Sequence, residues 1–354
     1  MLKSWKFPDE RGRCLILFMR HMGDTVITCG FVNSLRRRYP EMRVDILGRP
    51  DLREVCAAFS SFDEYIGVDF PVYGHHRRGL SDVKHALQAM LAVRRKHYTY
   101  CVNLVGDVRE NLIGWMTGAQ WKISPAWSQG HMFARKITPG MSWISNCGIE
   151  IPVEYRNYYD SLEYLAARLG LGKPEWHRRT ARKRARAEPP IVALHPGASH
   201  PSKRWETDKW KTLIRDLKTR GFRMTLLGSP AERGDLFAAF DQEIRDGAVE
   251  VRTSDLAGML EAVGEADLLV GMDSFSVHVA YAAGVPVVIL HGSSDPGVIN
   301  PPGGIELSAG NLCDVFPCHY KYPCKNSEGE YRCVRGIKTG EVVNAVGTLT
   351  GMEN

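Results

Sequence analysis

Short apolar runs alternate with amphipathic stretches over most of the chain, and this pattern predicts an α/β fold. Short runs of mainly apolar residues suit strands of a parallel sheet that is buried on both faces. The predicted strands are 13–19, 42–47, 98–105, 191–195, 222–227, 249–251, 266–270 and 285–290. Stretches with apolar residues three or four positions apart suit helices packed on such a sheet. The predicted helices are 26–39, 81–95, 111–117, 161–169, 207–220, 257–266 and 274–284. The aromatic-rich stretch around Trp121, Trp127 and Trp143 has no period that assigns it to either type.

Two such series of strands and helices, separated by a basic segment, predict two domains. A chain of 354 residues exceeds the length that one hydrophobic core usually organises. The segment from Trp176 to Pro190 is rich in arginine and lysine and poor in apolar residues, so it is the natural boundary. We expect domains over 1–180 and 190–354, each built on a parallel sheet, with a cleft between the two sheets.

Composition and charge narrow the range of functions. The apolar share of 44% and the charged share of 24% are those of a globular protein, and no apolar run reaches the roughly 18 residues of a membrane span. The first residues carry no hydrophobic signal region, so we expect a cytoplasmic protein. Much of the net charge of +6 falls in 178–186. Such a run suits a solvated linker, or a contact with anionic lipid headgroups or an acidic glycolipid.

The segment 266–290 carries the strongest indication of a binding site. It reads as a strand, a helix capped by Asp273 and Ser274, and a second strand. Ligands of open α/β sheets bind at the carboxyl ends of the strands. The free N–H groups of a helix start suit a phosphate, with Ser274 and Ser276 as further donors. His278 lies one turn further along the same helix face. The alternative is an ordinary aspartate cap with a surface histidine.

Two further polar turns follow predicted strands in the first half of the chain. Gly23-Asp24 follows 13–19, and Gly106-Asp107 follows 98–105. Neither turn belongs to a dinucleotide fingerprint, because the chain has no G-x-G-x-x-G. Lone Gly-Asp turns are usually structural, but a carboxylate at the carboxyl end of a strand can also serve as a general base.

A loop that bears a lysine follows the strand 191–195. Lys203 is a compact cation and is suited to neutralising a diphosphate without a metal. The alternative is a surface lysine beside a packed Trp205. No Asp-x-Asp metal motif stands at a convincing strand end, so we expect metal-independent chemistry.

Taken in order, these segments resemble glycosyltransferase family 9, the ADP-heptose:lipopolysaccharide heptosyltransferases. The matching motifs are Gly23-Asp24, His195-Pro-Gly-Ala198, Ser202-Lys-Arg-Trp205, Leu227-Gly-Ser-Pro-Ala-Glu232, Asp273-Ser-Phe-Ser-Val-His278 and Gly292-Ser-Ser-Asp-Pro296. The resemblance touches nearly the whole chain. It implies a GT-B fold of two Rossmann-like domains, with the acceptor bound mainly by 1–180 and the nucleotide-sugar by 190–354.

Transfer of a sugar from a nucleotide diphosphate needs a base for the acceptor hydroxyl and stabilisation of the leaving diphosphate. Asp24 is the first candidate for the base and Asp107 the second, while Lys203 is the candidate for the diphosphate. Direct displacement by the acceptor predicts inversion at the anomeric carbon. The resemblance implies a donor site formed by Gly23, Gly197, Ser199, Glu232, Asp273, Ser274, Phe275, Ser276 and His278.

Two of these donor-site residues need comment. Glu232 matches the position at which the acidic residue of the family holds the ribose hydroxyls. Phe275 stands where the family usually has glycine. Either the backbone approaches the phosphates differently in this chain, or an aromatic ring lines the pocket.

Four of the nine cysteines fall within 313–333, where apolar residues are too few for an independent core: Cys313, Cys318, Cys324 and Cys333. Four thiolates around zinc or iron would hold such a loop together. The spacing lacks C-x2-C pairs, so reduced thiols, or disulfides formed in air, are the alternative. The resemblance extends to a subgroup, the autotransporter heptosyltransferases, that carries a four-cysteine iron finger in this segment and modifies protein.

These observations together predict the partners. We expect ADP-heptose or a related nucleotide-sugar as donor and an acidic glycolipid, or else a protein, as acceptor. We also expect no cofactor for catalysis, with structural zinc or iron confined to the cysteine cluster, and peripheral contact with the inner face of the cytoplasmic membrane. A basic, cysteine-fingered nucleic-acid-binding protein is the alternative without an enzyme. We expect no nucleic-acid partner, because the basic residues are not interleaved with stacking aromatics.

Overall fold

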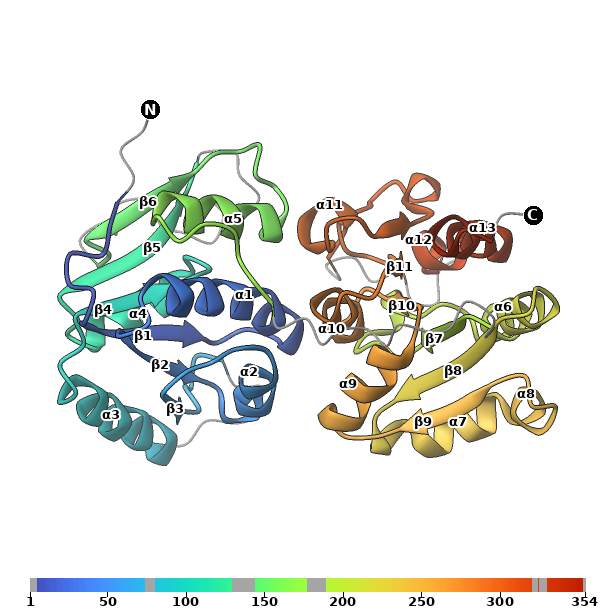
Figure 1. Cartoon of the computed structure of the whole chain (residues 1–354), viewed down its shortest axis with the longest axis horizontal. Helices are drawn as coiled ribbons and strands as arrows, with labels where there is room; N and C mark the ends of the chain where they lie inside the picture. Colours follow the sequence, from blue (N-terminus) through green and yellow to red (C-terminus); the bar gives the residue numbers. More distant parts are fainter. Residues whose placement is uncertain are drawn as a thin grey trace. The chain divides into compact units, whose positions relative to one another are not determined.

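The computed structural model describes residues 5–73, 80–128, 144–176, 189–319, 324 and 330–352. The chain divides into two compact units, Met1–Trp176 and His177–Asn354. Each unit contains a six-stranded sheet flanked by helices (Figure 1). The α/β class predicted from the alternating pattern is therefore confirmed.

All the strand pairs of the first unit are parallel, and their order is β3-β2-β1-β4-β5-β6. The strands are β1 (Arg13–Phe18), β2 (Arg43–Gly48), β3 (Glu64–Gly67), β4 (Tyr100–Asn103), β5 (Trp121–Trp127) and β6 (Cys147–Ile151). The helices are α1 (Met22–Arg38), η1 (Pro50–Leu52), α2 (Arg53–Phe59), α3 (Leu80–Arg94), α4 (Val108–Met116) and α5 (Tyr158–Arg168). Helices α1 and α5 contact each other (Figure 1). Helices α3 and α4 share a core cluster with Leu15 and Leu17 of β1.

The second unit repeats this arrangement with the order β12-β11-β10-β7-β8-β9, again with parallel pairs. Its strands are β7 (Ile191–His195), β8 (Arg223–Gly228), β9 (Glu250–Thr253), β10 (Leu268–Met272), β11 (Val287–Leu290) and β12 (Ile305–Leu307). Its helices are η3 (Pro201–Lys203), α6 (Thr207–Thr219), η4 (Pro230–Glu232), α7 (Arg233–Ala239), α8 (Asp241–Arg245), α9 (Leu256–Glu265), α10 (Phe275–Ala283), α11 (Pro296–Ile299), η5 (Gly310–Leu312), α12 (Arg332–Arg335) and α13 (Thr339–Thr350). Helices α6 and α13 cover one core cluster together.

The strand order creates one switch point in each sheet. In the first unit, the chain leaves β1 toward β2 and leaves β4 toward β5, so the two connections diverge from neighbouring strands. The same holds for β7 and β10 in the second unit. Ligands of doubly wound sheets bind at such points, outside the carboxyl ends of the strands. The segments that carry Asp24, Asp107, Lys203 and Asp273 each follow one of these four strands.

Several elements differ from the sequence prediction. The short strands β3, β5, β6 and β12 were not predicted. In β5 the pattern is interrupted by Pro125, which is tolerated because the strand's pairing with β4 ends at Ile123, so the missing N–H is not needed there. Helix α5 begins at Tyr158 rather than at Ser161, because the Asn157 side chain accepts a hydrogen bond from the N–H of Tyr159.

Two features of the sequence lie outside the described residues. These are the basic run 178–186 and Trp143. Within the parts of the chain that the structure describes, no helix combines the length and the apolar content that crossing a membrane requires.

Candidate functional site

An ion pair joins the two loops at the switch point of the second unit. Lys203 ends η3 after β7, and Asp273 follows β10. The Lys203 Nζ donates to Asp273 Oδ2 at 2.7 Å and to the Asp273 carbonyl oxygen at 3.1 Å, and the Ser294 hydroxyl donates to the same carboxylate. Although burial opposes ionisation, the charge of Lys203 and these hydrogen bonds lower the pKa of Asp273 to about 2. The carboxylate is therefore ionised at neutral pH and holds the ammonium group in place.

Gly292 allows the loop after β11 to lie against the backbone that carries Lys203. A Cβ atom at Gly292 would stand 1.9 Å from the carbonyl oxygen of Ser202 and 2.8 Å from the Cα of Lys203. Both contacts are to backbone, so no side chain could give way. The neighbouring Ser293 hydroxyl lies 2.9 Å from the Ser202 hydroxyl. Because of this close packing, the position of Lys203 is fixed from two sides.

The start of α10 differs from the predicted cap. Ser274 is the N-cap residue, but its side chain makes no cap hydrogen bond. Its hydroxyl lies 3.1 Å from that of Ser276 and 3.5 Å from Nδ1 of His195. The prediction that Asp273 caps the helix is wrong, because its carboxylate pairs with the cation of Lys203, which is a stronger partner than a backbone N–H. The start of α10 therefore has no side-chain cap from Ser274 and lies next to the ammonium group of Lys203, an arrangement suited to a phosphate.

The remaining residues predicted on α10 lie inside or at the start of the helix. Ser276 and His278 are buried, so the alternative of a surface histidine is wrong. Phe275 is the first residue of the helix and is half-buried.

Glu232 lies next to the loop that follows β7. A Cβ atom at Gly197 would stand 2.7 Å from Glu232 Oε1, so the absence of a side chain there admits the carboxylate. The N–H and the hydroxyl of Ser229 donate to Glu232 Oε2 at 2.8 and 2.7 Å. These bonds outweigh partial burial and lower the pKa of Glu232. Ser199, further along the same loop, is exposed.

In the first unit, Asp24 lies within helix α1 rather than in a turn before it. The helix begins at Met22, four residues earlier than predicted, so Gly23 and Asp24 belong to its first turn. The backbone N–H of His21 donates to Asp24 Oδ2 at 3.3 Å, which ties the start of the helix to this carboxylate. Asp24 is half-buried at the carboxyl end of β1.

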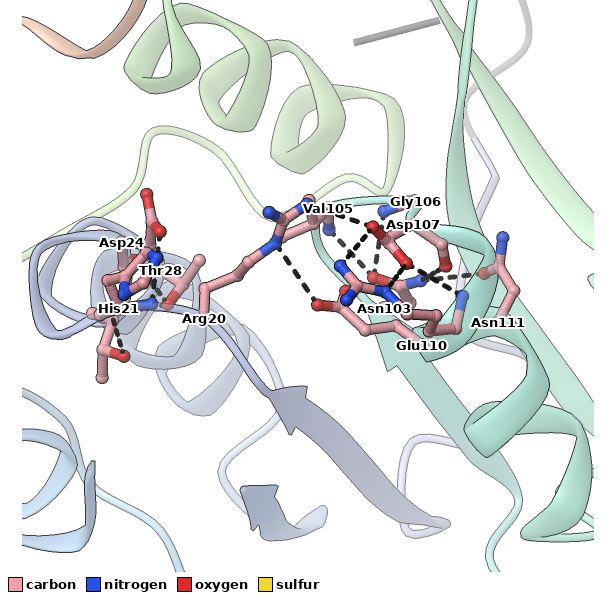
Figure 2. Close-up of polar contacts among 12 residues, drawn as sticks. Arg20, His21, Asp24, Thr28, Asn103, Val105, Gly106, Asp107, Glu110 and Asn111 are labelled. Carbon is pink, nitrogen blue, oxygen red and sulfur yellow. Dashed lines mark hydrogen bonds and ion pairs between the residues drawn. The ribbon is translucent and has the colours of Figure 1, made fainter. Parts of the chain in front are cut away.

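Asp107, which Figure 2 shows within a network of polar contacts, is held firmly by Arg109. It is the N-cap of α4, and its Oδ1 accepts from the Arg109 N–H at 2.9 Å. The Arg109 guanidinium also donates to both carboxylate oxygens, at 2.9 and 3.0 Å. Despite the opposing effect of burial, these bonds lower the pKa of Asp107. A carboxylate stabilised in this way is a weak base, so the geometry favours Asp24 over Asp107 for proton removal.

Two residues of this region were missed in the sequence. Arg20 lies between Asp24 on one side and Asp107 and Glu110 on the other (Figure 2). Its Nε lies 3.5 Å from Glu110 Oε1, and its Nη2 lies 3.5 Å from Asp107 Oδ2. The Glu110 side chain is 1% exposed, and neither carboxylate oxygen accepts a hydrogen bond from the described part of the chain. In the sequence, Glu110 reads as an ordinary acid in the first turn of a helix, so no local signal marks it.

The four cysteines of 313–333 lie close enough to influence one another. Burial raises the pKa of Cys333 to about 11, and the other three thiols, those of Cys313, Cys318 and Cys324, add to the rise. No disulfide joins any of the nine cysteines in the described structure. Among the described residues, no group of three or more metal-binding side chains is arranged to hold an ion. The metal site therefore stays a prediction.

The predicted residues, together with Arg20, Arg109 and Glu110, thus form two groups, each within its own unit. The second-unit cluster comprises Gly197, Lys203, Glu232, Asp273, Ser274 and Ser276 and surrounds the switch point between β7 and β10. The first-unit cluster comprises Arg20, Asp24, Asp107, Arg109 and Glu110 and surrounds the switch point between β1 and β4. The second-unit cluster has the features of a diphosphate site. The first-unit cluster holds carboxylates in contrasting environments.

Comparisons with known proteins agree with this geometry. The sequence profile of glycosyltransferase family 9 (heptosyltransferase) matches residues 87–330. Lipopolysaccharide heptosyltransferase 3 of Escherichia coli is 22% identical over 294 residues, which cover 78% of this chain and 82% of that protein. The structure of E. coli heptosyltransferase WaaC with ADP has a TM-score of 0.70 at 17% identity, covering 95% of this chain and 99% of that chain. The iron-containing dodecameric glycosyltransferase TibC from enterotoxigenic E. coli H10407 has a TM-score of 0.55 at 13% identity, covering 99% and 78%. The similarity to WaaC confirms the GT-B class that the motifs implied.

Proposed function

The chain belongs to glycosyltransferase family 9, and we propose that it transfers heptose from ADP-heptose to the inner core of lipopolysaccharide, with inversion at the anomeric carbon. The observation that carries this proposal is the Lys203–Asp273 pair at the start of α10, where no side chain caps the helix. A fixed ammonium group and free helix N–H groups at one switch point suit a diphosphate. The similarity to lipopolysaccharide heptosyltransferase 3 supports the choice of sugar and acceptor.

On the donor side, the second-unit cluster binds and activates the nucleotide-sugar. Lys203 and the first N–H groups of α10 stabilise the negative charge that grows on the diphosphate as its bond to the sugar breaks. The carboxylate of Glu232 accepts hydrogen bonds from the ribose hydroxyls. Asp273 does not touch the donor in this scheme, but it orients Lys203.

On the acceptor side, Asp24 acts as the general base. The acceptor oxygen attacks the anomeric carbon while the bond from that carbon to the diphosphate oxygen breaks, and the hydroxyl proton passes to Asp24. One displacement inverts the configuration, so no second carboxylate is needed as a nucleophile. Asp107, which Arg109 holds, keeps a structural role at the start of α4.

A donor screen tests this proposal. The purified chain is incubated with heptose-deficient lipopolysaccharide and with ADP-heptose, UDP-sugars or GDP-sugars, and transfer is followed by mass spectrometry. We expect transfer from ADP-heptose and at least a roughly tenfold lower rate from the other donors. Transfer from a UDP- or GDP-sugar alone would contradict the proposed donor, while transfer of heptose to a protein substrate alone would contradict the proposed acceptor.

A protein acceptor is the second candidate, and the observation that favours it is the group of four thiols around Cys333. TibC, which shares the fold, is an iron-containing glycosyltransferase. In this alternative the cysteine segment binds zinc or iron. The metal content of protein purified without chelator distinguishes the two candidates. About one tightly bound zinc or iron ion per chain would favour the protein acceptor, whereas far less than one ion per chain would remove the observation that favours it.

We also propose that helix α3 contacts an anionic membrane surface. Val83, Leu87 and Leu91 lie four residues apart on one stripe of α3, and their exposed fractions of 43%, 50% and 58% show that about half of each residue is open in the described structure. The exposed side chains of Lys84 and Arg94 flank this stripe. An apolar stripe bordered by cations is typical of a helix that lies in the headgroup region.

Vesicle binding tests the surface formed by α3. We expect the chain to sediment with vesicles that contain phosphatidylglycerol, and the double substitution Leu87→Glu, Leu91→Glu to weaken this binding by roughly tenfold, since each change removes buried apolar area and adds repulsion. The control is Leu312→Glu, which alters a leucine that is 52% exposed in the other unit. Equal binding of all three proteins would contradict the proposal.

A further inference from the structure

Glu110 is a buried carboxyl group that the proposed reaction does not use. Its side chain is 1% exposed, and neither oxygen accepts a hydrogen bond within the described structure. A buried polar group without a hydrogen bond lowers stability, and such groups in native proteins call for an explanation. The position of Glu110 in the first turn of α4 does not explain its burial, because Asp107 already caps this helix.

The contacts of Arg20 connect Glu110 with the proposed base. Arg20 approaches Glu110 through Nε and Asp107 through Nη2, each at 3.5 Å. Although burial lowers the pKa of the Arg20 guanidinium, the charges of Glu110, Asp24 and Asp107 together raise it above its usual value. Asp107 has its main partner in Arg109, which donates to both of its oxygens. Arg20 therefore pairs with Glu110 on one side, and the charge of Asp24 acts on it from the other side (Figure 2).

We propose that Glu110 is a positioning residue that sets the basicity of Asp24 through Arg20. This inference rests on the proposed function, in which Asp24 accepts the proton of the acceptor hydroxyl. While Glu110 carries its proton, the charge of Arg20 acts on the nearby aspartates alone and favours an ionised Asp24, which makes Asp24 a weaker base. When Glu110 loses its proton, its carboxylate partly neutralises the charge of Arg20 and places a negative charge near Asp24. Both changes increase the proton affinity of Asp24.

The surroundings of Glu110 set the pH at which it loses its proton, and this pH is close to neutral. Burial raises the pKa of Glu110 to about 8, with Arg20 and Arg109 opposing the rise and Asp107 and Asp24 adding to it. The titratable and charged groups that face it come from every neighbouring element: Arg20 after β1, Asp24 on α1, Tyr73 after β3, Asp107 and Arg109 at the start of α4, and Tyr158 on α5.

The proton balance of the reaction is unchanged by this residue. The acceptor hydroxyl gives its proton to Asp24 as the new bond to the anomeric carbon forms, and Glu110 neither gives nor takes a proton in that step. Its own proton exchanges with solvent beforehand. The residue therefore alters how strongly Asp24 attracts the proton, and through that the rate of transfer.

The pH dependence of kcat, measured from about pH 6 to 9.5 at saturating donor and acceptor, tests the inference. We expect kcat of the wild type to rise roughly three- to tenfold with a midpoint near pH 8. The isosteric change Glu110→Gln should remove this rise while the KM for the donor stays within about twofold, and Glu110→Asp should keep a rise at a shifted midpoint. The matched control Glu243→Gln, at a buried glutamate of the second unit, should leave the profile as in the wild type. A rise that persists in Glu110→Gln would overturn the inference.

A second measurement does not depend on activity. The pKa of Glu110 is raised in the folded state to about 8, so ionisation costs stability as the pH rises from the unfolded value of about 4.3 toward that value. The Tm of Glu110→Gln minus the Tm of the wild type should therefore increase over this range of pH and stay constant above it. A constant difference in Tm would contradict the inference. If the wild type transfers no sugar at any pH, the proposed function fails, and the Tm series still decides whether Glu110 titrates.

Discussion

The substitution Asp24→Asn should lower kcat by about 10²–10⁴-fold, because asparagine cannot accept the proton of the acceptor hydroxyl. The new side chain would keep the size of the old one and an oxygen for the N–H of His21, which now donates to Asp24, so the start of α1 should persist. The affinity for the donor should change by less than about threefold, since the donor cluster lies in the other unit. Steady-state kinetics and donor titration measure the two effects separately.

The matched control for this prediction is Asp107→Asn. Asparagine is as good an N-cap as aspartate, so α4 should remain intact while the ion pair with Arg109 is lost. We expect a fall in kcat of less than about tenfold. Should Asp24→Asn turn over at the wild-type rate while Asp107→Asn loses activity, the base must be reassigned to Asp107.

The substitution Lys203→Gln should have two large effects. It removes the cation from the diphosphate site, which we expect to lower kcat/KM by about 10²–10³-fold. It also leaves the carboxylate of Asp273, whose side chain is 2% exposed, without its ion-pair partner, and breaking a buried pair in this way costs about 3–5 kcal/mol. Thermal unfolding and kinetics should therefore both report a severe defect.

The double substitution Lys203→Gln, Asp273→Asn separates these effects. It removes both charges, so most of the lost stability should return while kcat/KM stays at the level of the single variant. Recovery of kcat/KM in the double variant would show that Lys203 acts only by supporting Asp273. Gly292→Ala provides an independent check, because its Cβ would displace the backbone at Ser202 and Lys203 without changing any charge.

The same ion pair predicts how stability responds to acid. The pKa of Asp273 is lowered in the folded state to about 2, against about 3.9 when unfolded. This stabilisation is fully present above about pH 4 and is lost as the pH falls toward about 2, and it corresponds to about 2–3 kcal/mol. The double variant should lack this part of the acid sensitivity.

Much of the fold could be predicted because buried parallel strands leave a strong pattern. The runs 13–19, 191–195 and 266–270 correspond to strands of the observed sheets, and the turns that follow them lie at the two switch points. The prediction failed where the pattern is short or interrupted. Strand β12 has only three residues. Strand β5 contains a proline, which is tolerated because its pairing with β4 ends before that residue.

Site residues could be predicted where the neighbouring sequence indicates their role, but contacts between residues far apart in the sequence could not. Lys203 and Ser274 follow recognisable strands, and the motifs around them suggested a phosphate. The ion pair between Lys203 and Asp273 joins residues 70 positions apart. Because the Asp273 carboxylate binds Lys203, it does not cap the helix as the local sequence predicted. Likewise, the environment of Glu110 depends on Arg20, which lies far earlier in the chain, so its unusual pKa has no counterpart in the local sequence.

The most direct test of the central claim is a calorimetric titration of ADP-heptose into two variants side by side. The claim is that the second-unit cluster holds the donor and that Asp24 in the first unit acts on the acceptor. We therefore expect Asp24→Asn to bind ADP-heptose within about threefold of the wild-type Kd, and the Lys203→Gln, Asp273→Asn variant to bind it at least about tenfold more weakly. Wild-type affinity in the double variant, or an equal loss in Asp24→Asn, would contradict this division of roles.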